Sequence, residues 1–276
     1  GCTVTFFALH AIGRTPAMLN FTAGIMNLRS ACEAANVRKI LTSRVFIKKA
    51  GLEPLANELS KHAQIIYLED IRKTLDIGDK IIALLKSFAP RMFAAKGNPD
   101  DTGVILFTSG SYGTPKGAVL SHANATRYRK VIKDSGLEWL SSDPGETALL
   151  AMPFGHIAGA GQALLILQSG GEMIIHREFD PGATLEAIEA HGLRRLFLVP
   201  AALQIMLAHP RAATTDFSSL GYFSYGASPI PVPLLEAGIA RLGCQFMQVY
   251  GMTETCGGVV ALPPEDHDPA RRHLLS

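Results

Sequence analysis

The sequence predicts an α/β fold in which stacked, largely parallel sheets are flanked by helices. Short apolar runs rich in branched and aromatic residues alternate with longer segments of helical periodicity along the chain. This alternation is typical of parallel sheets, because a parallel crossover usually contains a helix. A second observation is a glycine- and hydroxyl-rich loop between two apolar strand-like runs, at residues 103–122. We expect a first subdomain over residues 1–102 and a second, with the loop, over 103–276.

The composition fits a globular protein and narrows its function. Of the 276 residues 47% are hydrophobic and 18% charged, enough to bury a sizeable core in one or two domains. A net charge of +2 is too weak to indicate nucleic acid or an anionic membrane as the main partner. The four cysteines, Cys2, Cys32, Cys244 and Cys256, form no CxxC pair. Their spacing disfavours a zinc site or disulfide framework and fits a reducing cytosol.

The sequence predicts no membrane-spanning segment. Its most apolar stretch, 148–167, is interrupted by Pro153 and several glycines, and its continuous runs fall short of the ~20 residues that cross a bilayer. No signal peptide is expected, and the chain opens at Gly1 in what reads as the middle of an element. We therefore expect a fragment of a longer protein.

In the first part of the chain, periodicity and breaker residues predict alternating elements. The expected elements are a helix ending at TFFALHAIG, a strand at PAMLN, a helix over 22–36 capped by Thr22, a strand at KILTS, a helix over 46–59, a strand at QIIYLED, a helix over 77–88 and a loop at APRMFAAKGNPDD.

The same order continues after the loop. The expected elements are a helix over 122–133, a strand at TALLAM, a helix over 157–167, a strand at EMIIH, a helix over 184–191, a strand at LFLVP, a helix over 201–208, a strand at GYFSYG, a helix over 233–242 and a strand at QFMQVYG. The basic run RYRKVIK within 122–133 is interpreted as a solvated helix face rather than a binding patch.

The loop has the chemistry of an oligophosphate site. Strands at 104–107 and 118–120 flank it, and it holds the hydroxyls of Thr108, Ser109, Ser111 and Thr114, the glycines Gly110, Gly113 and Gly117, and the cation Lys116. Backbone N–H groups that a ligand can approach, hydroxyl donors and one lysine suit a charge spread over several oxygens. The sequence therefore predicts a nucleoside triphosphate as ligand. The loop is not the common P-loop, because Pro115 precedes the lysine and Gly117 follows it.

The run TSGSYGTPKG resembles the phosphate-loop signature of the adenylate-forming enzymes, the family of acyl-CoA synthetases, firefly luciferase and peptide-synthetase adenylation domains. One departure is Tyr112, where the family carries a small or polar residue. The resemblance implies the large N-terminal domain of such an enzyme, incomplete and without the C-terminal lid domain.

The run VYGMTETCGG resembles a second family motif, YGxTE. Glu254 supplies a hard carboxylate oxygen suited to Mg²⁺, and Thr253 supplies a hydroxyl for a phosphate oxygen. Tyr250 offers a flat face for a purine ring, and Gly251 and Met252 continue the expected nucleotide contact. The resemblance implies that Thr253 contacts the α-phosphate and that Glu254 holds the metal.

Two weaker motifs complete the expected site. YGASP resembles the family turn that lies against adenine, which implies that the backbone of Gly226, Ala227 and Ser228 forms a wall; alone it is a common turn. AMPFGHIAGAG is similar to a segment whose histidine lines the acyl pocket, which implies this role for His156. A lone histidine is otherwise more often a core residue.

The resemblance implies that a fatty or other carboxylate attacks Mg·ATP to give an acyl-adenylate, and that CoA or a carrier-protein phosphopantetheine then takes the acyl group. It implies Lys116 as a catalytic cation, an acyl carrier protein as one candidate partner, and a cytoplasmic location that leaves inner-membrane association open. The first part is most similar to the acyl-acyl-carrier-protein synthetase portion of bacterial acylglycerophosphoethanolamine acyltransferases, and the part from about Gly145 to fatty-acyl-CoA synthetases. An unusual subfamily and two joined halves both fit this.

Two other functional classes stay open. One is a catalytically incomplete module that binds nucleotide or acyl chain without turnover. The other, a kinase-type NTPase, is disfavoured because the acidic motif follows the loop by over a hundred residues. A Ser-His-Asp hydrolase is disfavoured because there is no GxSxG elbow, and PEDHDP is interpreted as a loop.

Overall fold

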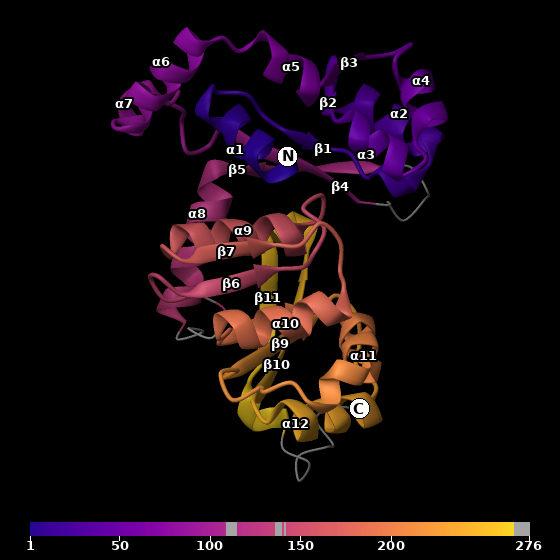
Figure 1. Ribbon diagram of the computed structural model, residues 1–276, viewed down its shortest axis with the longest axis vertical. Helices are drawn as coiled ribbons and strands as arrows, with labels where there is room; N and C mark the ends of the chain where they lie inside the picture. The colour runs from indigo at the N-terminus through magenta and orange to yellow at the C-terminus, as the bar shows by residue number, and fades with distance from the viewer. Residues whose placement is uncertain (109–114, 136–139, 141, 268–276) are drawn as a thin grey trace. The chain divides into compact units, whose positions relative to one another are not determined.

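The computed structural model describes residues 1–108, 115–135, 140 and 142–267, and it confirms the α/β class (Figure 1). The chain forms two compact units, Gly1–Ala123 and Asn124–Ser276. This division lies about twenty residues beyond the expected boundary at 102/103. The reason is that β1 pairs with β4, so the hairpin that flanks the predicted phosphate loop belongs to the first unit's sheet.

The first unit contains two small sheets. One has the strand order β1-β4-β5, in which β1 and β4 are parallel and β4 and β5 antiparallel, and the other pairs β2 with β3 in parallel. Its strands are β1 (Ala17–Met18), β2 (Lys39–Thr42), β3 (Gln64–Tyr67), β4 (Thr102–Thr108) and β5 (Lys116–Ser121). Its helices are α1 (Cys2–Ala11), η1 (Phe21–Ala23), α2 (Ile25–Ala34), α3 (Arg44–Lys49), α4 (Glu53–Leu59), α5 (Leu68–Thr74), α6 (Ile77–Ser87) and α7 (Pro90–Phe93).

Four expected elements of this unit are corrected. The helix expected over 46–59 is two helices, because Gly51 adopts φ +63°, which an α-helix cannot contain. The strand at QIIYLED ends at Tyr67, and its acidic residues fall in the first turn of α5, where they complement the helix dipole. The helix expected over 22–36 is η1 followed by α2, because Gly24 between them adopts φ +79°; Asn20 caps η1 by accepting the N–H of Thr22, and α2 begins without a side-chain cap. Residues 90–93 form a helical turn in the expected loop.

The second unit is built on a four-stranded sheet with the order β11-β10-β9-β8, in which β8, β9 and β10 are parallel and β11 is antiparallel. A parallel pair, β6 with β7, lies beside α9. The strands are β6 (Thr147–Leu150), β7 (Glu172–Ile175), β8 (Arg195–Leu198), β9 (Tyr222–Gly226), β10 (Gln245–Met252) and β11 (Gly257–Leu262). The helices are α8 (His122–Asp134), which begins at the end of the first unit, α9 (Ile157–Gln168), α10 (Pro181–His191), α11 (Pro200–Ala208), η3 (Pro210–Ala213), α12 (Val232–Leu242), η4 (Thr253–Thr255) and η5 (Pro264–His267).

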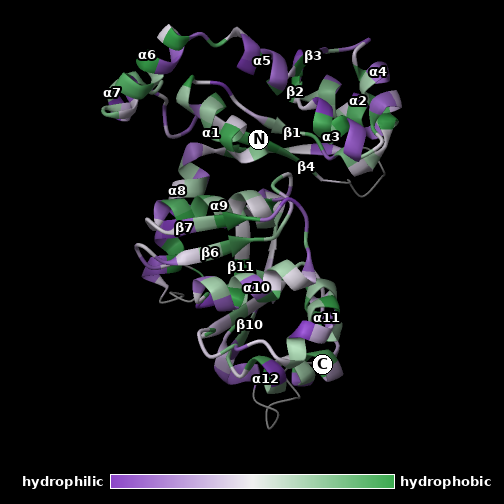
Figure 2. Ribbon diagram, in the orientation of Figure 1, coloured by the Kyte–Doolittle hydropathy of each residue, from purple (hydrophilic) through white to green (hydrophobic). Residues whose placement is uncertain are grey.

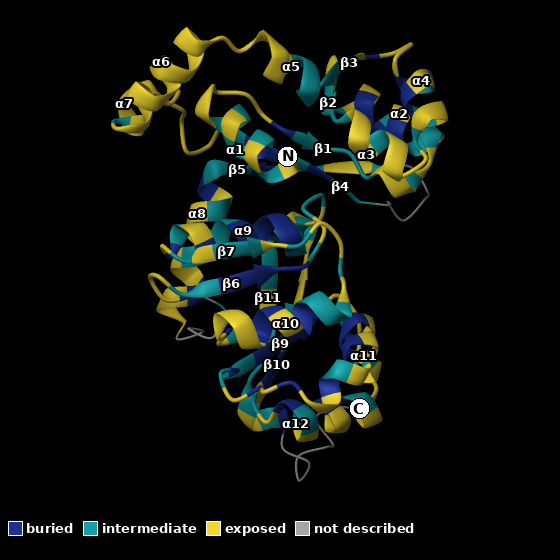
Figure 3. Ribbon diagram, viewed as in Figure 1, coloured by how far each residue is buried: buried dark blue, intermediate teal, exposed yellow. Residues whose placement is uncertain are grey.

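The second unit has the larger core. Leu185, Ile188, Leu198, Leu203 and Phe223 are completely buried between its helices and sheet (Figure 3). In the central strand β9 the four consecutive residues 223–226 are buried, as expected for a strand that is covered on both faces. This packing holds the carboxyl ends of β9 and β10, where two of the predicted nucleotide motifs lie.

Two features of the second unit differ from the expectation. β11 is a strand that is not among the expected elements, and it begins with two glycines, which are depleted in strands. PEDH, interpreted as loop, forms η5, whose His267 is 4% exposed. Among the described helices of both units, none combines the length and apolar character needed to cross a membrane.

Candidate active site

The β4–β5 hairpin carries the described ends of the predicted phosphate loop. Thr108 and Lys116 are paired across the two strands, and Lys116 is exposed. The predicted contacts Ser109, Gly110, Ser111, Gly113 and Thr114 lie outside the described residues. Within the part of the chain that is described, the Lys116 ammonium forms no ion pair, so its charge is available to an anion approaching this end of the hairpin.

Gly117 has a packing role in the same hairpin. A Cβ atom at this position would lie 3.0 Å from Cγ2 of Ile105 and 3.3 Å from Cε1 of Phe107. The glycine therefore lets two bulky side chains of β4 cover this part of β5. Packing is therefore a structural reason for a glycine at position 117, in addition to the predicted contact of Gly117 with the ligand.

The predicted adenine wall begins at the carboxyl end of β9. Gly226 is buried and stands opposite Val249 of β10, and a Cβ on Gly226 would lie 2.4 Å from the Val249 carbonyl oxygen. The next residue, Ala227, has φ +66°, a left-handed conformation that is costly for a residue with a Cβ atom. Ala227 and Ser228 are exposed. The strand therefore ends in a strained turn that presents backbone to solvent.

The YGMTE motif lies on the neighbouring strand. Tyr250, Gly251 and Met252 end β10, and the register to β11 shifts between Tyr250 and Gly251. A Cβ on Gly251 would lie 2.0 Å from the Gly257 carbonyl oxygen, so only glycine fits there. Tyr250 is 61% exposed, which leaves its ring face free to stack. Because β9 and β10 are parallel neighbours, the two motifs lie side by side at one sheet edge.

Thr255, a residue that the sequence reading missed, holds the turn that follows. Its hydroxyl accepts the N–H of Met252 at 3.1 Å and donates to the carbonyl oxygen of Gly257 at 2.6 Å. The turn places Thr253 half-buried and Glu254 exposed. No hydrogen bond or ion pair within the described residues engages the Glu254 carboxylate. A Ser or Thr placed to close a short turn is the signal that would have identified Thr255.

The carboxylate of Glu254 suits a magnesium ion that is bound mainly by a nucleotide. Mg²⁺ keeps several waters and takes one or two protein carboxylates together with phosphate oxygens. Among the described residues no group of three or more His, Cys, Asp or Glu side chains is placed to bind a metal by itself. A single exposed carboxylate with no competing partner is compatible with the nucleotide-dependent kind of site.

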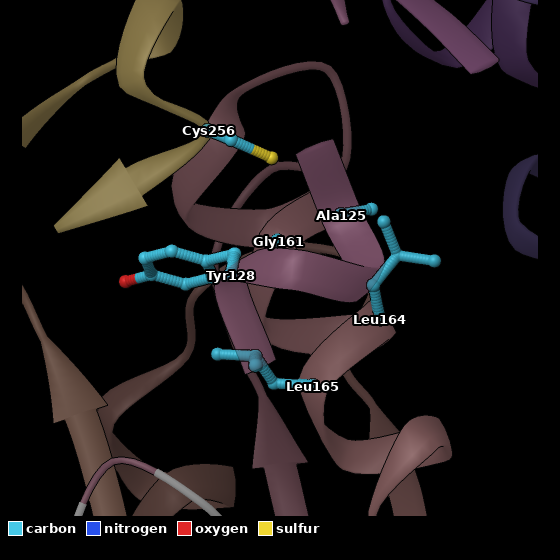
Figure 4. A pocket seen from close by; sticks show the side chains of 6 residues that line it. All are labelled: Ala125, Tyr128, Gly161, Leu164, Leu165 and Cys256. Carbon is cyan, nitrogen blue, oxygen red and sulfur yellow. The ribbon is translucent and has the colours of Figure 1, made fainter. Parts of the chain in front are cut away.

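The expected acyl segment begins α9. His156 is the residue that precedes the helix, is exposed, and makes no side-chain capping bond. A Cβ on Gly159 would lie 2.3 Å from the Pro153 carbonyl oxygen, so the turn before the helix packs directly on its first turn. One small hollow of about 10 Å³ lies further along α9, the space of a single water (Figure 4). Its lining residues are Ala125, Tyr128, Gly161, Leu164, Leu165 and Cys256, without His156.

The family follows from a comparison with known sequences. A family model described as AMP-binding enzyme matches residues 2–273. The chain belongs to this family. Membership of the AMP-binding enzymes agrees with the resemblance that the three motifs and the acyl segment indicated.

Curated relatives of this AMP-binding family member are ligases. It is 37% identical over 171 residues to the fatty acid–acyl-carrier-protein ligase ScoC of Streptomyces coeruleorubidus. The aligned residues cover 62% of this chain and 33% of ScoC. It is 42% identical over 165 residues to a feruloyl-CoA synthase of Amycolatopsis sp, 59% of this chain and 32% of the relative. With 4-coumarate–CoA ligase 2 of Oryza sativa the identity is 28% over 273 residues, 95% of this chain and 47% of the relative. The match thus spans a third to a half of each relative.

Solved structures of the family share the fold. The amide bond synthetase McbA of Marinactinospora thermotolerans is 28% identical, with a TM-score of 0.77, and the match covers 99% of this chain and 52% of that one. The O-succinylbenzoate coenzyme A synthetase of Bacillus subtilis, solved with ATP and magnesium ion, has a TM-score of 0.76 at 24% identity, covering 96% and 50% of the two chains. The second likeness concerns the fold alone.

Tyr128 links α8 to the strand after the YGMTE motif in this AMP-binding family member. Its hydroxyl accepts the N–H of Gly258 at 2.8 Å, and burial raises the pKa of the phenol. The basic run around Tyr128 contributes an ion pair between Lys130 and Asp134, in agreement with the interpretation of a solvated face. Tyr128 and Ile132 are exceptions in that run, because Tyr128 is half-buried and Ile132 is buried.

Proposed function

We propose that the chain takes part in ATP-dependent activation of a fatty or other carboxylate to an acyl-adenylate, followed by thioester formation with CoA or a carrier-protein phosphopantetheine. Family membership and the ligase relatives support the reaction class. The observation that carries the proposal is the parallel register in which Gly226 faces Val249. Ala227 and Tyr250 are the next residues along these two neighbouring strands, which supports a nucleotide wall at this end of the sheet.

The chemistry assigns one task to each group. The carboxylate forms a bond to the α-phosphorus while the bond to the pyrophosphate oxygen breaks, so negative charge on the leaving pyrophosphate must be met by fixed donors. Lys116 and the loop hydroxyls, among them Thr108, would supply these donors, and Thr253 would donate to the α-phosphate. Glu254 would hold Mg²⁺, which neutralises phosphate charge when bound.

The acyl group and the thiol acceptor are the open part of the proposal. The relatives are named for fatty acid, ferulate and coumarate, so we propose a carboxylate with an apolar body, and His156 as a residue that lines its pocket. We also propose a cytoplasmic protein whose acceptor is CoA or an acyl carrier protein.

Replacing Lys116 by alanine tests the phosphate contact. The expected result in calorimetry is a loss of ATP affinity worth about 1.5–3 kcal/mol, with AMP affinity much less affected, because AMP lacks the β- and γ-phosphates that the lysine would meet. Lys39→Ala, which removes an exposed strand lysine elsewhere in the first unit, is the matched control. Equal losses for ATP and AMP would remove Lys116 from this role.

Replacing Glu254 by glutamine tests the metal contact. A neutral amide is a poor ligand for a hard cation, so the variant should lose most of the Mg²⁺ dependence of ATP binding while remaining folded. Glu265→Gln, an exposed carboxylate on η5, is the control. An unchanged response of Glu254→Gln to a Mg²⁺ titration would contradict the assignment.

Fatty-acid-dependent exchange of pyrophosphate into ATP tests the reaction itself. Exchange that falls in Lys116→Ala and Glu254→Gln, with both controls unchanged, is the result expected for adenylate formation. Nucleotide binding without exchange would favour the alternative, a binding module. Absence of nucleotide binding would contradict the ligase function and a nucleotide-binding module, and would leave only an acyl-binding module.

A further inference from the structure

The segment 71–97 of the first unit has a chemistry that the ligase function does not use. All residues from 71 to 88 are exposed, although α6 carries many large apolar side chains (Figures 2 and 3). Ile77, Ile81, Leu84, Leu85 and Phe88 follow the spacing i, i+4, i+7, i+8, i+11, which places them on one side of the helix. We call these five residues the α6 face. It is an apolar stripe that the described residues leave in contact with solvent.

The exposure of the α6 face is large at each position. The exposed fractions are 75% for Ile77, 63% for Leu85 and 80% for Phe88. Met92 and Phe93 of α7 are also exposed, at 79% and 54%. Single exposed apolar residues need no explanation, but a ridge of five exposed apolar residues on one side of a helix indicates an interaction surface.

Positive charge is concentrated around this ridge. Residues 71–97 contain six basic residues, Arg72, Lys73, Lys80, Lys86, Arg91 and Lys96, and two acidic ones, Asp76 and Asp79. The whole chain has 26 basic and 24 acidic residues, so the remainder has 20 and 22, and is net negative. The segment therefore has a net charge of +4, whereas the whole chain has a net charge of +2. This local positive charge favours an anionic partner.

Local interactions form this segment without help from a core. Asp76 accepts the N–H of Asp79 at 2.7 Å, and Asp79 accepts the N–H of Asp76 at 3.1 Å, a reciprocal capping box that starts α6. Both acidic residues are thus engaged at the helix N-terminus. Lys86 lies 5.5 Å from the centre of the Phe93 ring and connects α6 to α7. The α6 helix is therefore formed by local interactions, and its apolar side stays exposed to solvent.

We propose that the α6 face docks onto the surface of an anionic lipid bilayer. A helix with an apolar side, flanking cations and no core contact is the arrangement that lies in the bilayer interface, with its apolar side inserted and its lysines and arginines near the headgroups. A folded acidic protein would also match the cations, but its charge alone does not account for an apolar stripe along the whole length of α6, which a bilayer interface would take up. The proposal concerns lipid binding and does not depend on ligase activity.

Vesicle flotation of the 276-residue chain tests the proposal. We expect the chain to float with vesicles of equimolar phosphatidylcholine and phosphatidylglycerol, and much less with phosphatidylcholine alone. Rising salt should weaken binding, because it screens the cations. Leu85→Glu should lower the partition coefficient by about tenfold or more, since it places a charge where an apolar side chain inserts.

Ala83→Glu is the matched control, because it adds the same charge to an exposed position on the opposite side of α6. It should lower the partition coefficient by about threefold or less, in line with a change of charge alone. Circular dichroism should show both variants folded, since both positions are exposed. Equal losses in the two variants would overturn the assignment of the apolar face. A chain that floats with neither vesicle, and instead forms a dimer that Leu85→Glu separates or binds an acidic carrier protein, would overturn the proposal.

Discussion

The sheets of the two units present their predicted nucleotide residues in different ways. In the second unit, β9 ends between β8 and β10, and Phe223 and Tyr225 are fully buried. In the first unit, β5 is an edge strand of a three-stranded sheet, and Val119 is 61% exposed. The strand that leads into the predicted wall is therefore held by packing between two neighbouring strands, whereas Lys116 is a side chain on an exposed edge strand.

This difference matches the chemical needs of the two parts of a nucleotide. A purine is flat and would be recognised in the proposed site by a fixed surface, and the close approach of Gly226 to Val249 supports a fixed backbone there. Phosphates are met by charges and donors, which an edge hairpin can present without a large core. We infer that substitutions in the wall act mainly on stability, and that those in the hairpin act mainly on binding.

The largest change in the free energy of unfolding is expected for a substitution in the core of the second unit, and it tests how closely that core is packed. Phe223→Ala should lower the free energy of unfolding by about 3–5 kcal/mol, because Phe223 is completely buried and its ring centre lies 4.8 Å from that of Phe246. Phe88→Ala, at a site 80% exposed in the first unit, should change it by less than about 0.5 kcal/mol. Urea unfolding measures both. Similar losses would mean that the two regions do not differ in packing.

Gly226→Ala tests the clamp at the end of β9. The added Cβ would meet the Val249 carbonyl oxygen at 2.4 Å, so the strands must separate, at a cost of about 1–3 kcal/mol in unfolding free energy. Nucleotide affinity should fall with it. At Gly155 nothing lies within 4 Å of the position that a Cβ atom would take, and Gly155→Ala should be nearly neutral in thermal unfolding. A neutral Gly226→Ala would show that the wall is not clamped.

The next largest effect is expected at the buried hydrogen bond between Tyr225 and His267. The hydroxyl of Tyr225 lies 3.0 Å from Nε2 of His267, whose Nδ1–H donates to the Pro263 carbonyl oxygen at 2.9 Å. Nε2 must therefore accept from Tyr225. Tyr225→Phe leaves this buried nitrogen without a donor and should lower the free energy of unfolding by about 1–2 kcal/mol. A loss confined to nucleotide affinity, with unchanged unfolding, would contradict this account.

The same pair predicts how stability changes with pH. Burial lowers the pKa of His267 in the folded chain. As the pH falls below about 6.5, the unfolded chain therefore binds a proton at this histidine before the folded chain does, and the free energy of unfolding decreases. Burial raises the pKa of Tyr225 to about 12. Above about pH 10 the unfolded tyrosine ionises first, and stability decreases again. Urea titrations across this range check both limbs, and Tyr225→Phe should weaken the alkaline one.

The smallest expected effect concerns the link from α8 to β11. Tyr128→Phe removes the acceptor of the Gly258 N–H and should lower the free energy of unfolding by about 0.5–1.5 kcal/mol. Tyr250→Phe is the control, because that ring is 61% exposed and its hydroxyl has no partner within the described residues. Thermal unfolding of the two variants separates them. Equal, negligible shifts would show that the Tyr128 bond is not part of what holds β11.

The sequence by itself determined the fold class and the family. Strand and helix periods, the hydroxyl- and glycine-rich loop, and the motifs around Gly226 and Glu254 are local patterns, and local patterns are readable from one chain. The family match over residues 2–273 confirms that interpretation. The roles of the individual site residues stay predictions, and those between Ser109 and Thr114 fall outside the described residues.

Only the tertiary structure decided what non-local packing imposes. Gly226 and Gly251 face backbone of neighbouring strands, Tyr128 reaches Gly258 across 130 positions, and His267 is buried against Tyr225 from a segment that reads as a loop. The α6 face shows the converse, since its amphipathic pattern predicts a helix but cannot tell whether its apolar side is covered. The physical reason is the same: burial and close approach depend on which distant segment lies opposite a residue, and one-dimensional periodicity carries no record of that partner.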